Sequence, residues 1–127
     1  MARSEQESYA SNQARAAQLE HRKARIRALN DDLRRLRTGG RLVLTRGVAA
    51  LGNPVVIQLL QAIAAFDAFS ADNDPYDLHD FGAIEIEGHR LFWKIDCYDK
   101  QLEYGSPDPS DPEVTARVLT VMLAQEY

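Results

Sequence analysis

The sequence contains a single cysteine, Cys97, so an internal disulfide framework and a zinc site built from paired cysteines are both excluded. Long hydrophobic runs are also missing, because no stretch reaches about 18 consecutive apolar residues, and we expect no membrane span. The first ten residues, MARSEQESYA, lack the apolar centre of a secretory signal. These absences favour a cytoplasmic protein.

The composition that remains is typical of one folded domain. The chain has 127 residues, of which 45% are hydrophobic and 27% are charged. At this length a single core can stabilise the fold without disulfides or structural metals. We therefore expect one domain and no cofactor.

Charge is divided unevenly along the chain, although the net charge is only −4. Residues 1–66 hold 11 Lys and Arg against 5 Asp and Glu, whereas residues 67–127 hold 4 against 14. Such a division indicates charged partners. Two alternatives are also open: the poles face each other within the molecule, or they decorate opposite sides of it.

The hydrophobic pattern predicts an α+β domain with the element order α-β-α-β-β-β-α. We expect residues 1–10 to be disordered, residues 11–38 to form a basic helix that ends at Gly39-Gly40, and residues 39–127 to form the core. Within that core, the pattern predicts strands at residues 41–46, 83–86, 90–96 and 101–104 and an apolar, central helix at 54–68 capped by Asn53. Asp111 is expected to cap a last helix with a stripe of Val114, Val118, Val121 and Met122. An antiparallel sheet would pack against the helices, with Trp93 in the core.

The basic helix carries an incomplete heptad seam of Leu19, Ile26, Leu29, Leu33 and Leu36. Residues 26–36 are expected to dock on the core, and the first half of the helix to project into solvent or to pack against a partner. If that partner is a second copy, the protein is a homodimer.

Several blocks resemble the domain of unknown function 3768, a family of small alphaproteobacterial proteins often carried on mobile elements. The blocks are IRALNDDLRR (26–35), GGRLVLTRGVAALG (39–52), DNDP (72–75), HDFG (79–82), FWKIDCYD (92–99) and SPDP (106–109), and the resemblance covers residues 24–127. Cys97 stands where the family pattern usually has tyrosine. The resemblance implies no catalytic residues, because the family has no established activity.

Motifs for catalysis and nucleotide binding are missing. The sequence has no GxSxG, no phosphate-binding glycine loop and no Asp/Glu-x-Lys nuclease pattern. The acidic segment 72–80 offers Asp72, Asp74 and His79 as weak metal ligands, but the calcium-loop pattern fails at its glycine and glutamate positions. We expect a structural turn there, and a metal-dependent enzyme remains a third hypothesis.

Two surfaces are candidates for binding. The first hypothesis is a non-catalytic interaction protein, an inhibitor of a host nucleic-acid-targeting defence system that meets a basic protein partner through acidic loops. Its candidate residues are Asp72, Asp74, Asp77, Asp80, Asp108 and Asp111. The alternative is a nucleic-acid-binding regulator that uses the basic helix, through Arg22, Arg25, Arg34 and Arg35. Lys94 and Asp96 share a strand face and are expected to form a structural ion pair.

Overall fold

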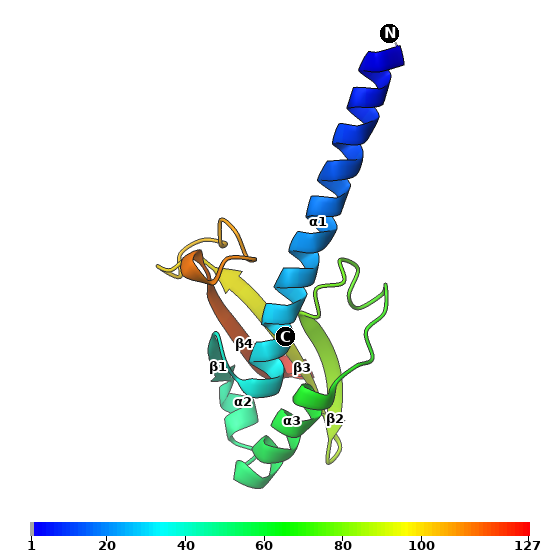
Figure 1. Ribbon diagram of the computed structural model, residues 1–127. Coiled ribbons are helices and arrows are strands. Elements are labelled where there is room, and N and C mark those ends of the chain that lie inside the picture. Colours follow the sequence, from blue (N-terminus) through cyan, green and yellow to red (C-terminus); the bar gives the residue numbers. More distant parts are fainter. Residues whose placement is uncertain (1) are drawn as a thin grey trace.

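The computed structural model describes residues 2–127, with side chains from Glu5 onward. It begins with one long helix, α1 (Ala2–Leu36), whose first half projects away from all later elements (Figure 1). The expectation of disorder over residues 1–10 is therefore corrected for residues 2–10, and Met1 lies outside the described residues. Good helix formers and the lack of glycine and proline before Gly39 explain why the helix extends so far.

Helix α1 ends where the glycine pair was expected to end it. Arg37 and Gly39 adopt left-handed conformations, with φ of 56° and 79°. Gly40 then passes so close to the strand beside it that a Cβ atom there would lie 2.5 Å from the carbonyl oxygen of Arg117. The chain can turn into the sheet because this position has no side chain.

The remaining elements form the body of the molecule, residues 39–127. Its strands are β1 (Arg41–Leu44), β2 (Phe81–Ile86), β3 (His89–Tyr98) and β4 (Ala116–Leu123). Its helices are α2 (Arg46–Ala49), α3 (Asn53–Ala65) and the short 3₁₀ turns η1 (Pro112–Val114) and η2 (Ala124–Glu126). The strand order is β1-β4-β3-β2, with β1 parallel to β4 and the other pairs antiparallel.

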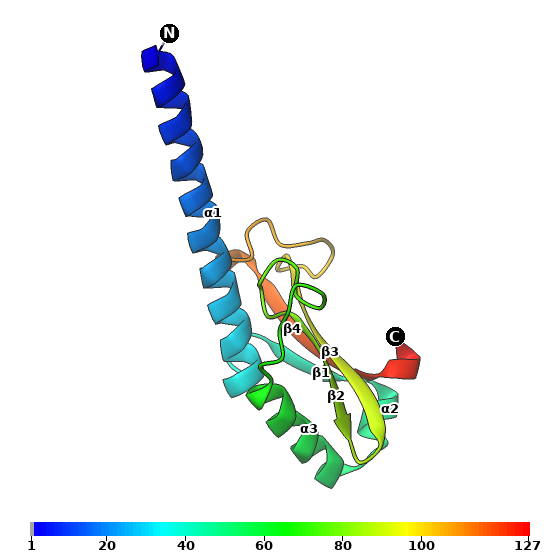
Figure 2. The same ribbon diagram turned by 90° about the vertical axis from the view of Figure 1, so that its right-hand side faces the viewer.

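The α+β class is confirmed, with a mixed sheet in place of the expected antiparallel one. The last turns of α1 and the whole of α3 lie on the same side of the sheet (Figure 2). On the opposite face, the ring of Tyr127 packs against Phe81 and Phe92, with centroid distances of 6.4 and 5.4 Å. The helices therefore cover one face of the sheet, and the chain end packs on the other.

The predicted last helix is wrong, because residues 116–123 form strand β4. Asp111 does act as a cap, accepting from the backbone N–H of Glu113, but the helix that it caps stops after the single turn η1. Strand β4 lies between β1 and β3; the face with Leu119 and Val121 includes the charged Arg117, and the opposite face carries the apolar Val118 and Met122. This hides the two-residue alternation of a strand, and Val114, Val118 and Val121 then imitate a helical stripe.

The strand predicted at residues 101–104 is also wrong. The segment is a turn in which Leu102 has φ of 60°, and only an isolated bridge joins Tyr98 to Gly105. Helix α3 is confirmed in its position, although Gly52 precedes it as the cap in place of Asn53. It buries one face, through Val55, Leu59 and Ile63, and leaves Ile57 58% exposed, so it is less central than predicted.

Trp93 is fully buried at the centre of the core, as predicted. A Cβ atom at Gly82, opposite Trp93 on β2, would lie 2.4 Å from the indole Nε1, so this glycine makes room for the ring. The ring meets Phe66 edge-to-face at a centroid distance of 5.5 Å. The buried cluster around it comprises Leu33, Val48, Leu59, Ile63, Leu91, Ile95, Leu119 and Val121.

Replacing Trp93 by alanine tests this core. The variant should lose about 3–5 kcal/mol of unfolding free energy, because truncating a buried aromatic ring leaves a large cavity. The wild-type fluorescence should be blue-shifted and resistant to quenchers. Chemical denaturation of both proteins measures the difference, and emission like that of free indole would contradict the burial of Trp93.

Candidate functional site

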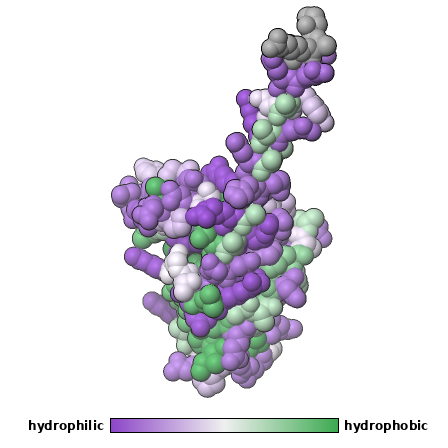
Figure 3. Space-filling view, viewed as in Figure 1, coloured by the Kyte–Doolittle hydropathy of each residue, from purple (hydrophilic) through white to green (hydrophobic). Residues whose placement is uncertain are grey.

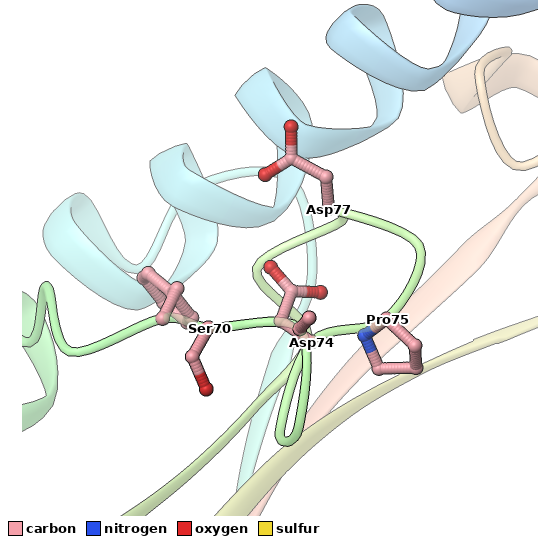
Figure 4. Close-up of a pocket in the computed structure, with 6 residues that line it drawn as sticks. Ser70, Asp74, Pro75 and Asp77 are labelled. Carbon is pink, nitrogen blue, oxygen red and sulfur yellow. The ribbon is translucent and has the colours of Figure 1, made fainter.

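The acidic loop, residues 70–80, folds around one buried carboxylate. Asp74 is 5% exposed, and its two oxygens accept hydrogen bonds from the backbone N–H groups of Leu78 (2.9 Å) and His79 (3.1 Å). Figure 4 shows the Asp74 carboxylate turned into the loop, with Asp77 standing beside α1. Asp74 is thus a structural residue, because both of its carboxylate oxygens are used in hydrogen bonds to the backbone of the loop.

The same loop brings together three groups that have the chemistry of metal ligands. Asp74, Asp77 and His79 place ligand atoms within 4.8 Å of one another, whereas the predicted ligand Asp72 is not in this group. All three already have partners in the protein: the His79 Nδ1 lies 2.9 Å from Asp31, and Asp77 accepts from Arg27 at 2.8 Å. The His79 ring also stacks on Phe69 at 3.9 Å. The loop is built by these contacts, in agreement with the expected structural turn.

Both acidic loops bind the same stretch of α1. Arg22 forms an ion pair with Asp108 in the second acidic loop, residues 106–111, with Nη2 and Oδ1 3.0 Å apart. The Nε of Arg25 donates to the carbonyl oxygen of Ser110 at 2.8 Å. Arg27 reaches the other loop and donates to the carbonyl and carboxylate oxygens of Asp77, each at 2.8 Å. The basic and acidic parts of the sequence therefore meet within the molecule.

A buried polar bridge lies beneath these surface pairs. Asn30 is 1% exposed; its Nδ2 donates to the carbonyl oxygen of Leu78, and its Oδ1 accepts from Arg117 at 2.7 Å. Arg117 also donates to the carbonyl oxygen of Pro109, so one side chain of α1 connects both acidic loops to β4. Burial lowers the pKa of the Arg117 guanidinium from its usual value.

Arg34 is the most deeply buried charge in this part of α1. Its side chain is 0% exposed, and its Nε and Nη2 both lie 2.9 Å from Asp31 Oδ1. Its Nη1 donates to the carbonyl oxygens of Ile63 (3.0 Å) and Phe66 (2.8 Å) at the end of α3. The guanidinium also lies over Phe69 and Trp93, 5.2 and 5.9 Å from their ring centroids. A nucleic acid cannot reach this side chain, which removes Arg34 from the predicted phosphate contacts.

The predicted acidic set does not form one open surface. Asp72 is exposed and Asp74 is buried; Asp77 and Asp108 are paired with arginines. Hydrogen bonds from Ser110, followed by the charge of Arg22, lower the pKa of Asp108. Desolvation, with a further contribution from Asp74, raises the pKa of Asp80. Of the predicted arginines, Arg22 and Arg25 bind the second acidic loop, and Arg35 is exposed.

The face of the sheet opposite α3 carries the expected ion pair. Lys94 Nζ lies 3.0 Å from Asp96 Oδ2, and this hydrogen bond raises the pKa of Lys94. Both side chains are more than a third exposed, so the pair contributes little to stability. Burial raises the pKa of the neighbouring Cys97 thiol, which keeps it protonated at neutral pH, as a small core residue would be.

Sequence reasoning missed Asn30, Asp31 and Arg117, which hold the loops in place. The sequence holds a signal for one of them, since Asn30 falls on the docking face of a helix between Ile26 and Leu33. A polar side chain at such a position needs a specific partner. No comparable signal points to Arg117, because the sequence pattern around it predicts a helix.

Replacing Asp74 by alanine tests the architecture of the acidic loop. The variant should lose about 1–3 kcal/mol of unfolding free energy, because two backbone N–H groups lose their acceptors. The matched Asp72→Ala variant changes an exposed carboxylate of the same loop and should stay within about 0.5 kcal/mol of wild type. Urea denaturation of both variants measures this, and equal effects would contradict a structural role for Asp74.

Within the described residues, no helix is both long and apolar enough to cross a membrane. No curated protein and no solved structure matches the chain. The family model described as protein of unknown function (DUF3768) matches residues 44–126, from the end of β1 to η2. This match spans well over half of the sequence, and the chain therefore belongs to the DUF3768 family.

Proposed function

We propose that this chain is a non-catalytic interaction protein whose binding element is the projecting half of α1, residues 5–21. Every residue from Glu5 to Arg22 is exposed, so the body covers none of this segment. Figure 3 shows it standing clear of the body as a largely hydrophilic rod. At about 1.5 Å per residue it reaches roughly 25 Å beyond the body.

The observation that carries the proposal is the contrast between the two halves of α1. The second half is fixed by buried side chains, among them Asn30, Leu33 and Arg34. The first half has no such packing, and an isolated polar helix of this length is only marginally stable in water. A partner that covers the projecting half would supply the missing contacts, and the anchored half would hold it in one direction for that partner.

Charge favours a protein over a nucleic acid as the partner. The projecting half carries Glu5, Glu7 and Glu20 against a single arginine, Arg15, so it would not attract phosphates. The arginines of α1 concentrate in its anchored half, where Arg22, Arg25 and Arg27 bind the acidic loops. The same pairing weakens the acidic-surface version of the hypothesis, because Asp77 and Asp108 are engaged by these arginines. An anti-defence role would require that the partner belong to a host defence system. The mass of the cross-linked product, in the experiment below, identifies the partner and so tests this role.

Site-specific photo-cross-linking tests the proposal in cells that naturally produce the chain. A photoreactive residue at Leu19, which is 52% exposed, should give a discrete cross-linked protein product. The same residue at Leu102, 44% exposed on the body, is the matched control and should give none. The proposal is wrong if Leu19 yields no product, or if Leu102 yields the product instead.

A further inference from the structure

We propose that the groove between the end of α1 and helix α3 binds an acidic peptide segment of another protein, with an apolar side chain as its anchor. The groove has a volume of about 380 Å³. It is lined from the end of α1 and from the outer side of α3 by Arg35, Arg37, Ile57, Leu60, Gln61 and Ala64. It lies at the other end of α1 from the projecting half, so this inference is independent of the binding element proposed above.

The floor of the groove is an uncharged helix surface. Helix α3 has no charged residue in its 13 positions, although 27% of the chain is charged. On its outer side Ile57 is 58% exposed, and Leu60 and Ala64 lie on the same side of the helix and are half-buried. Figure 3 shows apolar side chains gathered on the lower part of the body, where Figure 1 places α3. A helix surface that faces water usually carries charged side chains, so this one is suited to contact with another molecule.

Two arginines stand at the edge of this apolar surface with their charges unused. Arg35 and Arg37 are exposed, and within the described part of the chain no hydrogen bond or ion pair engages either guanidinium. The backbone still fixes where they stand. Arg34 ties α1 to the end of α3, and the N–H of Arg37 donates to the carbonyl oxygen of Leu33 at 2.8 Å. Both positive charges are therefore held beside the groove and are available to a ligand.

The uncharged floor and the free arginines together indicate the chemistry of the partner. Protein–protein contact surfaces are typically depleted of charge at their centre and enriched in arginine. An apolar side chain of the partner would enter the groove against Ile57 and Leu60, as anchor residues do at the centre of an interface. Carboxylates beside that anchor would pair with Arg35 and Arg37, because a guanidinium binds a carboxylate through two parallel hydrogen bonds.

A nucleic acid and an anionic membrane fit the groove less well. A nucleic acid strand presents a row of phosphates to several cations, whereas the groove offers two cations and an apolar floor. A membrane surface is met by clustered basic side chains around an apolar surface that enters the lipid. Here the apolar side chains line a hollow, which favours a ligand that inserts a side chain into it.

Selection from a library of short random peptides displayed on phage tests the proposal, with the full chain as target. Wild type should enrich peptides in which Asp or Glu flanks Leu, Phe or Trp. The double variant Arg35→Gln/Arg37→Gln should lose this enrichment, because the charges that pair with the carboxylates are gone. Arg46→Gln removes an exposed arginine outside the groove and is the matched control, which should select the same peptides as wild type.

The apolar anchor is tested with a synthetic copy of the most enriched peptide, whose affinity is measured by fluorescence anisotropy. Ile57→Gln should weaken binding by about tenfold, because the groove then offers the anchor a polar side chain. Leu102→Gln changes an exposed leucine outside the groove and should leave the affinity unchanged. All substituted residues are exposed, and circular dichroism should show each variant folded like wild type.

Three results would overturn the proposal. The first is a wild type that enriches no acidic peptide, and the second is enrichment that survives Arg35→Gln/Arg37→Gln. The third is wild-type binding to phosphatidylcholine–phosphatidylserine vesicles or to a single-stranded oligonucleotide that the double variant loses, because the groove would then serve lipid or nucleic acid. The cross-linking at Leu19 probes the projecting half, so each of these results leaves the proposed function to be decided by that experiment.

Discussion

The buried guanidinium of Arg34 is the constraint around which the molecule is arranged. A charge removed from water is tolerated only where opposite charge and hydrogen-bond acceptors surround it. Arg34 finds the carboxylate of Asp31 within its own helix and the carbonyl oxygens of Ile63 and Phe66 at the end of α3. The last carbonyl groups of a helix lack partners and carry the negative end of its dipole, so they suit a cation well. One side chain therefore joins α1 to α3.

The effect of this contact extends to the acidic loop. Asp31, which pairs with Arg34, also lies 2.9 Å from the Nδ1 of His79, whose ring stacks on Phe69. Outside this buried centre, three further arginines of α1 bind the two acidic loops through ion pairs and hydrogen bonds: Arg22, Arg25 and Arg27. Of the alternatives that the uneven charge leaves open, the structure favours the one in which the two poles face each other. Much of the opposite charge is used to hold α1 in place, and the projecting half, residues 5–21, is exposed.

The sequence predicted those features that depend on local patterns. The glycine pair after α1, the burial of Trp93, the hairpin of β2 and β3 and the pairing of Lys94 with Asp96 all follow from turn residues or from alternation. Strand β4 was missed because the charged Arg117 stands on its inward face and the apolar Val118 and Met122 on its outward face, so its pattern resembles a helix. Asn30, Arg34 and Arg117 were missed as buried residues because each has a partner between 29 and 87 positions away in the sequence. A local sequence pattern predicts that such polar side chains are exposed, because their distant hydrogen-bond partners are known only from the fold.

The most direct test of this account compares two neighbouring arginines of α1 by chemical denaturation. Arg34→Ala should lose about 3–5 kcal/mol of unfolding free energy, because it breaks a buried ion pair and leaves the carbonyl groups at the end of α3 without a donor. Arg35→Ala removes the same kind of side chain from an exposed position and should change stability by less than about 0.5 kcal/mol. Equal, small effects of the two substitutions would contradict the claim that Arg34 fixes α1 to the body.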